Sequence, residues 1–428
     1  MNRFLLTTST LVALTNAATA QVTFHFIGLG FATDVSADGS VVVGNTEGDF
    51  ETFRWTVLDG IVPLGRATVP VLGIGAGAPD VSADGTMISA TILGANGTYA
   101  TQGRWTRGSG WQEMMPPTPP DGGLIDSAYG SAWGLSDDGN TLLGLYWRPG
   151  QLDGLAHASR WTPATGVVDL GSGGGNSRAN DANADGTVIV GWDEDPSFGT
   201  WWPTVWVNGV RTTLTQTVGF AEADAVTPDG TMIVGSSWRI PHQPWHPTMA
   251  AAWRWNGASW VEEILGFLPG TAAPFGLAVG SDVTADGSMV VGFNRFSGPT
   301  DATGFIWTAA TGIMDVEDFL LNNGVTPDPN FDIRTISAVS DDGTVLVGSG
   351  QDLVAPFRAR SFLITVPAPC SLLGDINQDG QLDGRDIAGF IRAKLGQPPE
   401  PGEQPACANY GGTLQQDMAA FIADLLAN

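Results

Sequence analysis

The sequence predicts a mainly β protein, a seven-bladed β-propeller followed by a small α-helical module. Two observations lead to this prediction. A short motif occurs seven times before residue 350, and a loop-and-helix segment near the C-terminus occurs twice. In the motif, an Asp-Gly pair follows a short apolar and polar stretch and precedes a second apolar run. Its seven aspartates are Asp38, Asp84, Asp138, Asp185, Asp229, Asp286 and Asp342.

Each repeat is predicted to contain four strands. Successive motif aspartates lie from 44 residues apart (Asp185 to Asp229) to 57 residues apart (Asp229 to Asp286), which fits four short strands with loops. The Asp-Gly pair predicts a hairpin between the first two strands, because glycine takes the positive φ of a tight turn. A tryptophan marks the third strand in six repeats, and an apolar-Gly pair ends the fourth. These tryptophans are Trp55, Trp105, Trp161, Trp206, Trp255 and Trp307.

The seventh repeat has Phe362-Leu363-Ile364 as its third strand and has no fourth strand of its own, since residues 362–366 run directly into Pro367. Residues 22–30, at the other end of the chain, match the fourth-strand pattern. We therefore expect the N-terminal strand to complete the last blade. Closure of the ring in this way removes exposed sheet edges.

The repeats resemble the bacterial extracellular repeat called HAF, in which a Ser-x-Asp-Gly hairpin is followed by an aromatic-Arg-Trp-Thr strand. Residues 53–56 (Phe-Arg-Trp-Thr) carry the second part, as do residues 103–106 and 159–162. The resemblance covers residues 31 to about 366. The motif is also similar to the repeat of TolB-type propellers, which implies the same architecture. HAF repeats imply no particular activity.

Residues 1–20 have the pattern of a secretory signal peptide: Arg3, an apolar stretch, and Ala18-Thr19-Ala20 before the expected cleavage site. This apolar stretch is too short to span a membrane, and nowhere else does an apolar run reach the roughly 18 residues that a membrane helix needs. The chain has 18 basic and 44 acidic residues and a net charge of -26, which repels nucleic acid and anionic membranes. We expect a secreted protein with no nucleic-acid partner and no membrane span.

Catalytic residues are not evident in the propeller. Asp34-x-Ser36-x-Asp38 resembles the start of a calcium loop, but Val42 occupies the ninth position, where such loops place an oxygen ligand. The motif aspartates are therefore predicted to form hairpin turns. His242-x-x-x-His246 has the spacing of zinc ligands, but the surrounding prolines exclude a helix.

The recurring tryptophans are interpreted as packing residues between blades. Trp201-Trp202 and residues 238–246 lie outside the repeat pattern. They are the candidates for a glycan-binding surface, because carbohydrate rings stack on exposed tryptophans.

Residues 375–386 have the spacing of an EF-hand calcium loop. Side-chain oxygens occur at loop positions one, three, five, nine and twelve; glycine occupies position six, and Gln381 at position seven would contribute its carbonyl. The predicted ligands are Asp375, Asn377, Asp379, Gln381, Asp383 and Asp386. A helix should follow, because apolar residues recur with helical spacing after Asp386.

The loop and helix are followed, 31 residues later, by a second copy in which Asp417 aligns with Asp386. This duplication resembles a dockerin, the family that attaches secreted proteins to cohesins, and covers residues 375–426. The resemblance implies partner contacts by Gly384 and Arg385. Of the ligand positions only Asp417 survives in the second copy, so that copy is expected to hold no calcium.

Cys370 and Cys407 flank the calcium loop and are expected to form a disulfide in an oxidising compartment, the alternative being two free thiols. The predicted organisation is a signal peptide (1–20), a propeller (21–366) and a dockerin-like module (367–428). The expected function is that of a secreted non-catalytic binding or scaffold protein, tethered through the module to a cohesin-like or surface partner. The alternative is a polysaccharide-degrading enzyme carrying a dockerin.

Overall fold

The computed structural model contains two compact units, Val22–Val366 and the segment from Pro367 to Asn428. It describes residues 21–427 except 67–76, 95–99, 115–129, 148–154, 198, 217–218, 239–246, 273–274, 298–300, 368–371, 378–379, 396, 398–404 and 409–412. The predicted signal peptide, Cys370, Asp379 and the His242 to His246 loop lie outside these residues. No helix in the described part of the chain is long and apolar enough to cross a membrane.

The unit Val22–Val366 is mainly β. Repeat 1 consists of β1 (Thr23–Val35), β2 (Val42–Thr46), β3 (Thr52–Thr56) and β4 (Gly60–Pro63). Repeat 2 consists of β5 (Asp80–Val81), β6 (Met87–Leu93), β7 (Ala100–Thr106) and β8 (Gly110–Met114). Repeat 3 consists of β9 (Gly130–Leu135), β10 (Leu142–Trp147), β11 (Ala156–Thr162) and β12 (Gly166–Gly171). Repeat 4 consists of β13 (Ser177–Ala182), β14 (Val188–Glu194), β15 (Trp201–Val207) and β16 (Val210–Thr213).

The last three repeats follow the same order. Repeat 5 consists of β17 (Ala223–Val226), β18 (Met232–Ser237), β19 (Met249–Trp255) and β20 (Trp260–Gly266). Repeat 6 consists of β21 (Leu277–Val283), β22 (Met289–Arg295), β23 (Ala302–Thr308) and β24 (Gly312–Asp315), and helix α2 (Val316–Asn322) follows it. Repeat 7 has β25 (Phe331–Val339), β26 (Val345–Asp352) and β27 (Ala359–Thr365).

The seven predicted Asp-Gly hairpins are confirmed. In each repeat the first two strands pair antiparallel around the motif, and the turn glycine has a φ between 67° and 72°. The aspartate carboxylate fastens the turn, since its Oδ1 accepts the backbone N–H two residues later at 2.8–3.0 Å. The motif therefore forms a turn in which the aspartate carboxylate already accepts a hydrogen bond from its own segment.

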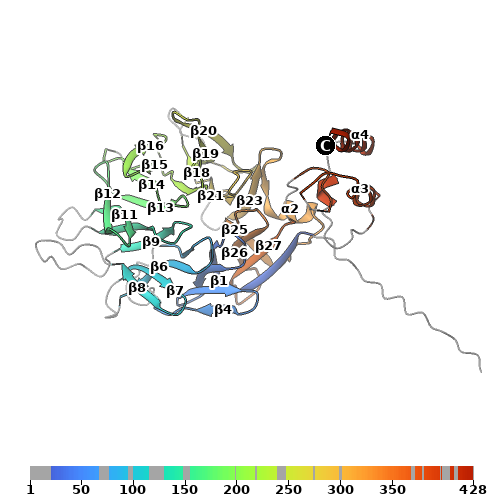
Figure 1. Ribbon diagram of the computed structural model, residues 1–428. Helices are drawn as coiled ribbons and strands as arrows, with labels where there is room; N and C mark the ends of the chain where they lie inside the picture. The colour runs from blue at the N-terminus through green and yellow to red at the C-terminus, as the bar shows by residue number, and fades with distance from the viewer. Residues whose placement is uncertain are drawn as a thin grey trace, which may run out of the picture. The chain divides into compact units, whose positions relative to one another are not determined.

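The ring closes through β1, as the sequence predicts. The first part of β1 pairs with β27, and its second part pairs with β2, so one strand belongs to both repeat 7 and repeat 1. In Figure 1 the blue strand β1 lies beside the orange strands β26 and β27. As a result, the described strands form five four-stranded sheets and one seven-stranded sheet.

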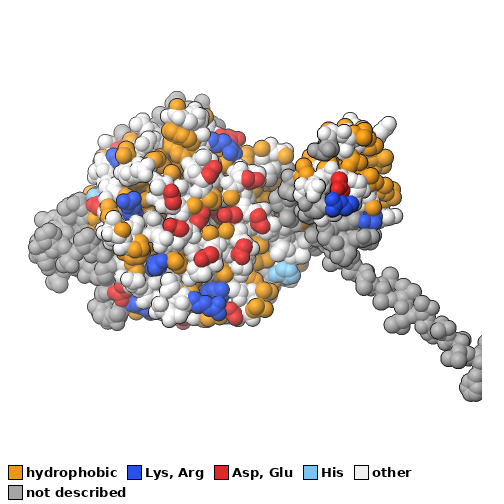
Figure 2. Space-filling view, viewed as in Figure 1, with side chains coloured by type: hydrophobic (Ala, Val, Ile, Leu, Met, Phe, Trp, Pro, Cys, Tyr) orange, Lys and Arg blue, Asp and Glu red, His pale blue; other side chains and the backbone are white. Residues whose placement is uncertain are grey.

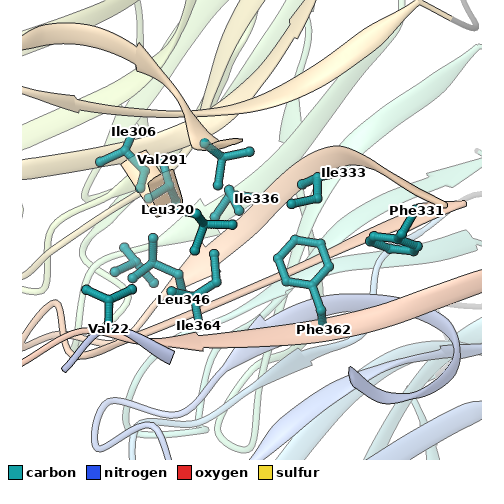
Figure 3. Close-up of a cluster of buried hydrophobic side chains, with 12 residues drawn as sticks. Val22, Val291, Ile306, Leu320, Phe331, Ile333, Ile336, Leu346, Phe362 and Ile364 are labelled. Carbon is teal, nitrogen blue, oxygen red and sulfur yellow. The ribbon is translucent and has the colours of Figure 1, made fainter. Parts of the chain in front are cut away.

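The sheets are arranged as a β-propeller. The first strand of each repeat contacts the first strand of the next repeat, and β25 contacts β1, so these strands form a closed ring. Apolar side chains fill the space between neighbouring sheets. Figure 3 shows one such cluster, in which Val291 of β22 and Ile306 of β23 lie near Ile333, Leu346 and Ile364 of repeat 7.

The packing role of the repeat tryptophans is confirmed in five repeats and needs one correction. In repeat 1, Trp55 of β3 is the register partner of Val42 in β2. Ile233 is the equivalent of Val42 in repeat 5, and its partner is Trp253, not the predicted Trp255. Trp253 is fully buried, whereas Trp255 is 43% exposed. Residues two apart in a strand face the same side, so both tryptophans of β19 lie on one face. The pairing register places Trp253 opposite Ile233.

The C-terminal unit contains α3 (Ile387–Lys394), the 3-10 helix η1 (Pro405–Ala408) and α4 (Leu414–Ala427). Its core consists of Ile376, Leu382, Phe390, Cys407, Ala408 and Phe421. Phe390 of α3 and Phe421 of α4 stack with ring centroids 4.0 Å apart. These two residues occupy equivalent positions in the two copies, so the duplicated helices pack through the same side chain.

Candidate functional site

A cavity of about 250 Å³ lies at the centre of the ring, and residues from all seven repeats line it. We call it the central channel. Among its described lining residues, Arg178 is the only basic one, whereas seven are aspartates: Asp34, Asp80, Asp137, Asp181, Asp224, Asp282 and Asp341. The structure therefore concentrates carboxyl groups along the axis of the propeller.

β-Bulges in the first strands bring these side chains into the channel. In six repeats the pairing of the first two strands shifts by one residue immediately before the motif, leaving Thr33, Trp133, Asn180, Asp224, Ser281 or Ser337 unpaired. A bulge allows two consecutive side chains to face the same side, which the alternation of a regular strand forbids. Both Thr33 and Asp34 can therefore line the channel.

Four of the channel aspartates each connect their own repeat to the next one, and we call them the clamp aspartates. Each carboxylate accepts a backbone N–H from the first strand of the following repeat at 2.8–2.9 Å. The pairs are Asp34 with Val81, Asp80 with Leu135, Asp181 with Val226, and Asp282 with Val339. These hydrogen bonds satisfy buried amides that no sheet ladder can reach, so they stabilise the ring.

Burial raises the pKa of all four clamp aspartates, and well above the usual range for Asp80, Asp181 and Asp282. For Asp80, Asp181 and Asp282, neighbouring carboxylates add to the effect, because like charges in a confined space disfavour ionisation. Asp34 and Asp80 interact directly: the pKa of Asp80 is raised by burial and then by Asp34, whereas the contact with Asp80 opposes the effect of burial on Asp34. Burial in the channel thus disfavours the ionised form of all four carboxyls.

The pKa values of the motif aspartates shift in the opposite direction. They are exposed, and hydrogen bonds from their own turns lower their pKa values, as Ser40 does for Asp38 and Ser82 does for Asp84. The seven turns follow directly from the ring of first strands, so their ionised carboxylates surround one mouth of the channel. Figure 2 shows acidic side chains gathered over the middle of one face of this unit and basic ones nearer its rim.

The same mouth holds two further carboxyls. Asp137 and Asp341 occupy the position before the motif aspartate; burial and then nearby carboxylates raise the pKa of both, that of Asp137 to about 6. Backbone hydrogen bonds join neighbouring turns here, for example from Asp341 N–H to the Ala37 carbonyl. The line of such bonds stops at Pro228, which has no N–H.

Arg178 forms a separate polar cluster in the channel. Its guanidinium lies 3.6 Å from the ring centroid of Trp133, donates to Asn180 Oδ1 at 2.6 Å and pairs with Glu222. Nearby, Asp224 Oδ2 is buried with no hydrogen-bond partner. Burial and then the Glu222 charge raise the pKa of Asp224 well above its usual range.

Three residues outside the channel have the outline of a serine-hydrolase triad. The Asp169 carboxylate lies 3.0 Å from His157 Nδ1, and Ser172 Oγ lies 3.4 Å from His157 Nε2. The sequence analysis missed this arrangement, because the three residues share no motif. Their position on β11, on β12 and just after β12 becomes clear only once these strands pair.

The surroundings of Ser172 do not suit catalysis. Acyl transfer needs N–H groups aimed at a developing oxyanion. Here the Gly174 N–H donates to Ser172 Oγ itself at 3.2 Å, and the Gly173 N–H donates to the Asp193 carboxylate at 2.9 Å. A carboxylate thus lies where a negative oxyanion would need a donor. We interpret the three residues as a structural hydrogen-bond chain.

The aromatic residues proposed for glycan binding are partly packed. Trp201 stacks on Trp192 with ring centroids 4.3 Å apart, and Phe220 contacts it edge-on at 5.0 Å. One ring face of Trp201 is therefore covered by protein. Phe220 is 64% exposed, so the cluster still presents apolar surface to solvent.

The loop at residues 375–386 is curved around its buried carboxylates. Asp375 and Asp386 are 1% and 0% exposed; Asp375 accepts the Gly380 N–H at 2.9 Å, and Asp386 accepts N–H groups of Ile376 and Asn377 at 2.8 and 3.1 Å. Gly380 has a φ of 79°, as a sharp turn at loop position six requires.

Oxygen donors are the ligand type that a hard cation such as calcium requires, and Asp375, Asn377, Gln381, Asp383 and Asp386 are the predicted ligands among the described residues. Asp379, the fifth-position ligand, lies outside the described residues. Within the described ranges no group of three or more His, Cys, Asp or Glu side chains is arranged to hold a metal ion. Calcium binding therefore stays a prediction.

The residues expected to contact a partner lie on the surface. Gly384 and Arg385 are exposed, and the Arg385 guanidinium donates to Asp383 Oδ2 at 2.8 Å. A bound cation would compete with this ion pair for Asp383. Cys407 is fully buried, while Cys370 lies outside the described residues, so the disulfide also stays a prediction.

Comparison with known proteins finds no matching family model and no matching curated protein. Among solved structures, the chain is similar to an oligogalacturonate lyase in complex with manganese, with 12% identity, a TM-score of 0.48 and coverage of 82% of this chain and 95% of that one. It is also similar to the β-propeller domain of the Trilobed protease from Pyrococcus furiosus, with 12% identity, a TM-score of 0.47 and coverage of 79% and 96%.

A third similar structure is TolB from Acinetobacter baumannii, with 11% identity and a TM-score of 0.40. The match covers 80% of this chain but only 64% of TolB. TM-scores below 0.5 support no functional inference, and the propeller assignment rests on the closed ring of first strands.

Proposed function

We propose that this chain is a secreted, non-catalytic binding propeller of seven blades, which a calcium-stabilised, dockerin-like module attaches to a surface or an extracellular complex. One observation carries the non-catalytic assignment. Each clamp aspartate accepts a backbone amide of the next sheet, so these four channel carboxyls serve to join neighbouring sheets.

The blade count is supported by the ring of seven first strands and by the sharing of β1 between repeats 1 and 7. The HAF-type motif recurs at the same place in every blade, at the turn that follows the first strand. Such a repeat is consistent with a scaffold whose specificity depends on the loops that vary between blades.

The proposed binding surface of the propeller is the mouth formed by the motif aspartates. Their carboxylates are exposed and stay ionised near pH 7, because turn hydrogen bonds lower their pKa values. Several like charges around one opening attract cations and repel anions. Cationic groups on a partner therefore suit this mouth. A glycan at Trp201 and Trp202 is the second candidate, supported by the exposed Phe220 beside them.

The rival function is a polysaccharide-degrading enzyme. It would need two carboxyls flanking a sugar-binding cleft, one as acid and one as base or nucleophile. Asp34 and Asp80 are neighbouring carboxyls, but they interact with each other and each accepts a backbone N–H of the next sheet. Both carboxyls are thus engaged within the protein, so binding is favoured over catalysis.

The attachment role is supported by apolar surface on the C-terminal unit. Helix α3 exposes Ile387, Ile391 and Leu395 at four-residue spacing, and α4 exposes the equivalent Met418, Ile422 and Leu426. Solvent-exposed stripes of this kind suit docking to a protein surface. In the dockerin-like reading, Gly384 and Arg385 lie beside the first stripe and would contact a cohesin-like partner.

Calcium would stabilise the loop at residues 375–386 by neutralising Asp375 and Asp386, which are both buried. A Cys370 to Cys407 disulfide is proposed to close the same segment. It is supported by the absence of free cysteines among the described residues and by the burial of Cys407. Disulfides form outside the cytoplasm, which agrees with the signal peptide predicted at residues 1–20.

The test is calcium-dependent capture. The full chain would be immobilised and exposed to the culture supernatant of its own cells, with calcium or with chelator, and compared with Asp375→Ala and with the surface variant Ile391→Asp. We expect a partner that is retained only by the wild type in calcium. Retention of the same proteins by all three forms, with and without chelator, would contradict attachment through this module.

A further inference from the structure

The two copies of the loop-and-helix segment have a buried aspartate at one equivalent position. Asp386 and Asp417 align in the duplication, and they are 0% and 1% exposed. Phe390 and Phe421, four residues after them, stack on each other and fix the two copies in equivalent positions. Each copy must therefore stabilise a buried carboxylate at the same position, since an unpaired buried charge is strongly unfavourable.

One partner distinguishes the second aspartate. Asp386 accepts three backbone N–H groups of its own loop, from Ile376, Asn377 and Asp383, at 2.8–3.1 Å. Asp417 forms an ion pair with the Lys394 ammonium, which comes from the last turn of α3. The Lys394 side chain is largely covered, with 18% of it exposed.

Lys394 is the only lysine in the 428 residues. Its equivalent in the second copy is Leu425, so the pairing occurs once and cannot serve Asp386. The module therefore has one lysine at the end of α3, and its ammonium lies against the start of α4. Helix α4 belongs to the second copy, in which Asp417 is the one remaining ligand residue.

The start of α4 also differs from that of α3. α4 begins at Leu414, whereas the equivalent of the first residue of α3, Ile387, is Met418; the helix is thus one turn longer at its start. Thr413 and Gln416 form a capping box, with Thr413 N–H to Gln416 Oε1 at 2.8 Å and Gln416 N–H to Thr413 Oγ1 at 3.4 Å. Residues 414–416 are therefore helical, whereas the equivalent residues 383–385 belong to the predicted calcium loop of the first copy.

We propose that the Lys394 ammonium replaces the second metal ion of the duplicated module, so that the module takes one calcium and its α4 half folds without any. The count of one calcium rests on the proposed calcium loop at residues 375–386; the pairing of Lys394 with Asp417 does not. The exposed stripe of α4 would then persist when calcium is withdrawn, while the loop before α3 loosens.

The experiment uses the full chain, with hydrogen exchange followed by mass spectrometry on peptides from residues 375–386 and 414–427, and native mass spectrometry to count bound calcium. Lys394→Met removes the charge, Lys394→Arg keeps it, and Lys394→Met with Asp417→Leu removes both charges. Breaking a buried pair on one side is strongly destabilising, whereas replacing both partners by apolar groups is often neutral.

We expect one calcium in the wild type, and chelator should speed exchange in 375–386 with little effect on 414–427. Lys394→Met should speed exchange in 414–427 by about tenfold or more, while Lys394→Arg and the double variant stay near the wild type. Two bound calcium ions, or unchanged exchange in Lys394→Met, would overturn the proposal. If the wild type binds none, the calcium loop is wrong, and the exchange of the lysine variants still decides the role of Lys394.

Discussion

Replacement of Asp137 by asparagine should stabilise the propeller at alkaline pH and leave it unchanged in acid. Burial beside Asp341 and Asp34 raises the pKa of Asp137 from 3.8 to about 6. The folded state therefore holds a proton that the unfolded chain releases, so stability falls as the pH rises from about 4 through 6. A shift of about two units corresponds to about 3 kcal/mol, which solvent at this half-buried carboxyl reduces to about 1–2 kcal/mol.

The assay is thermal unfolding at pH 4 and pH 8, followed by tryptophan fluorescence, since all sixteen tryptophans precede residue 308 and report on the propeller alone. At pH 8 the melting temperature of Asp137→Asn should exceed that of the wild type by roughly 2–5 °C, and at pH 4 the two should coincide.

The matched control for this prediction is the neighbouring residue, Asp138. Its pKa is lowered in the folded state by hydrogen bonds from Ser136 and Asn140, which outweigh its burial. It therefore contributes stability above the unfolded pKa of about 4, which is lost as the pH falls further. Asp138→Asn should lower the melting temperature at pH 8. A stabilisation by Asp137→Asn that is equally large at pH 4 would refute the electrostatic reasoning.

Two further predictions concern packing and the clamps, and both can be measured by denaturant unfolding of the full chain. Trp253→Ala should cost about 3–5 kcal/mol and Trp255→Ala less than about 1 kcal/mol, because only Trp253 is buried; equal costs would show that the register is wrong. Asp282→Ala should cost about 1–3 kcal/mol by leaving the Val339 N–H unpaired, whereas Asp282→Asn keeps an acceptor and should cost less; a larger loss in the asparagine variant would exclude the clamp role.

The hairpins and the closure of the ring could be predicted because both depend on local signals. An Asp-Gly turn is specified by the glycine at positive φ, and the unpaired seventh repeat together with residues 22–30 revealed how the ends meet. The assignment of Trp255 failed because two tryptophans lie two residues apart on one strand face. Only the register against Ile233 separates them, and register is a property of the pairing.

The channel could not be predicted for a related reason. Asp34 precedes the motif by one residue, and in a regular strand it would face away from Thr33; the bulge between them brings both to the channel. The partner of Asp34 is a backbone amide 47 residues away, at Val81. The available signal was an aspartate directly before the first apolar residue of the motif. It is present in four of the seven repeats, as Asp34, Asp80, Asp181 and Asp282.

The same repeat uses two aspartates four residues apart for opposite purposes. Asp34 lies inside the ring, where burial raises its pKa, and Asp38 lies on the turn, where hydrogen bonds lower its pKa. The formal charge of -26 counts both as ionised. Burial disfavours ionisation in the channel, whereas the exposed carboxylates of the turns stay ionised near neutral pH. A cationic partner would therefore be attracted to the mouth without having to enter the channel.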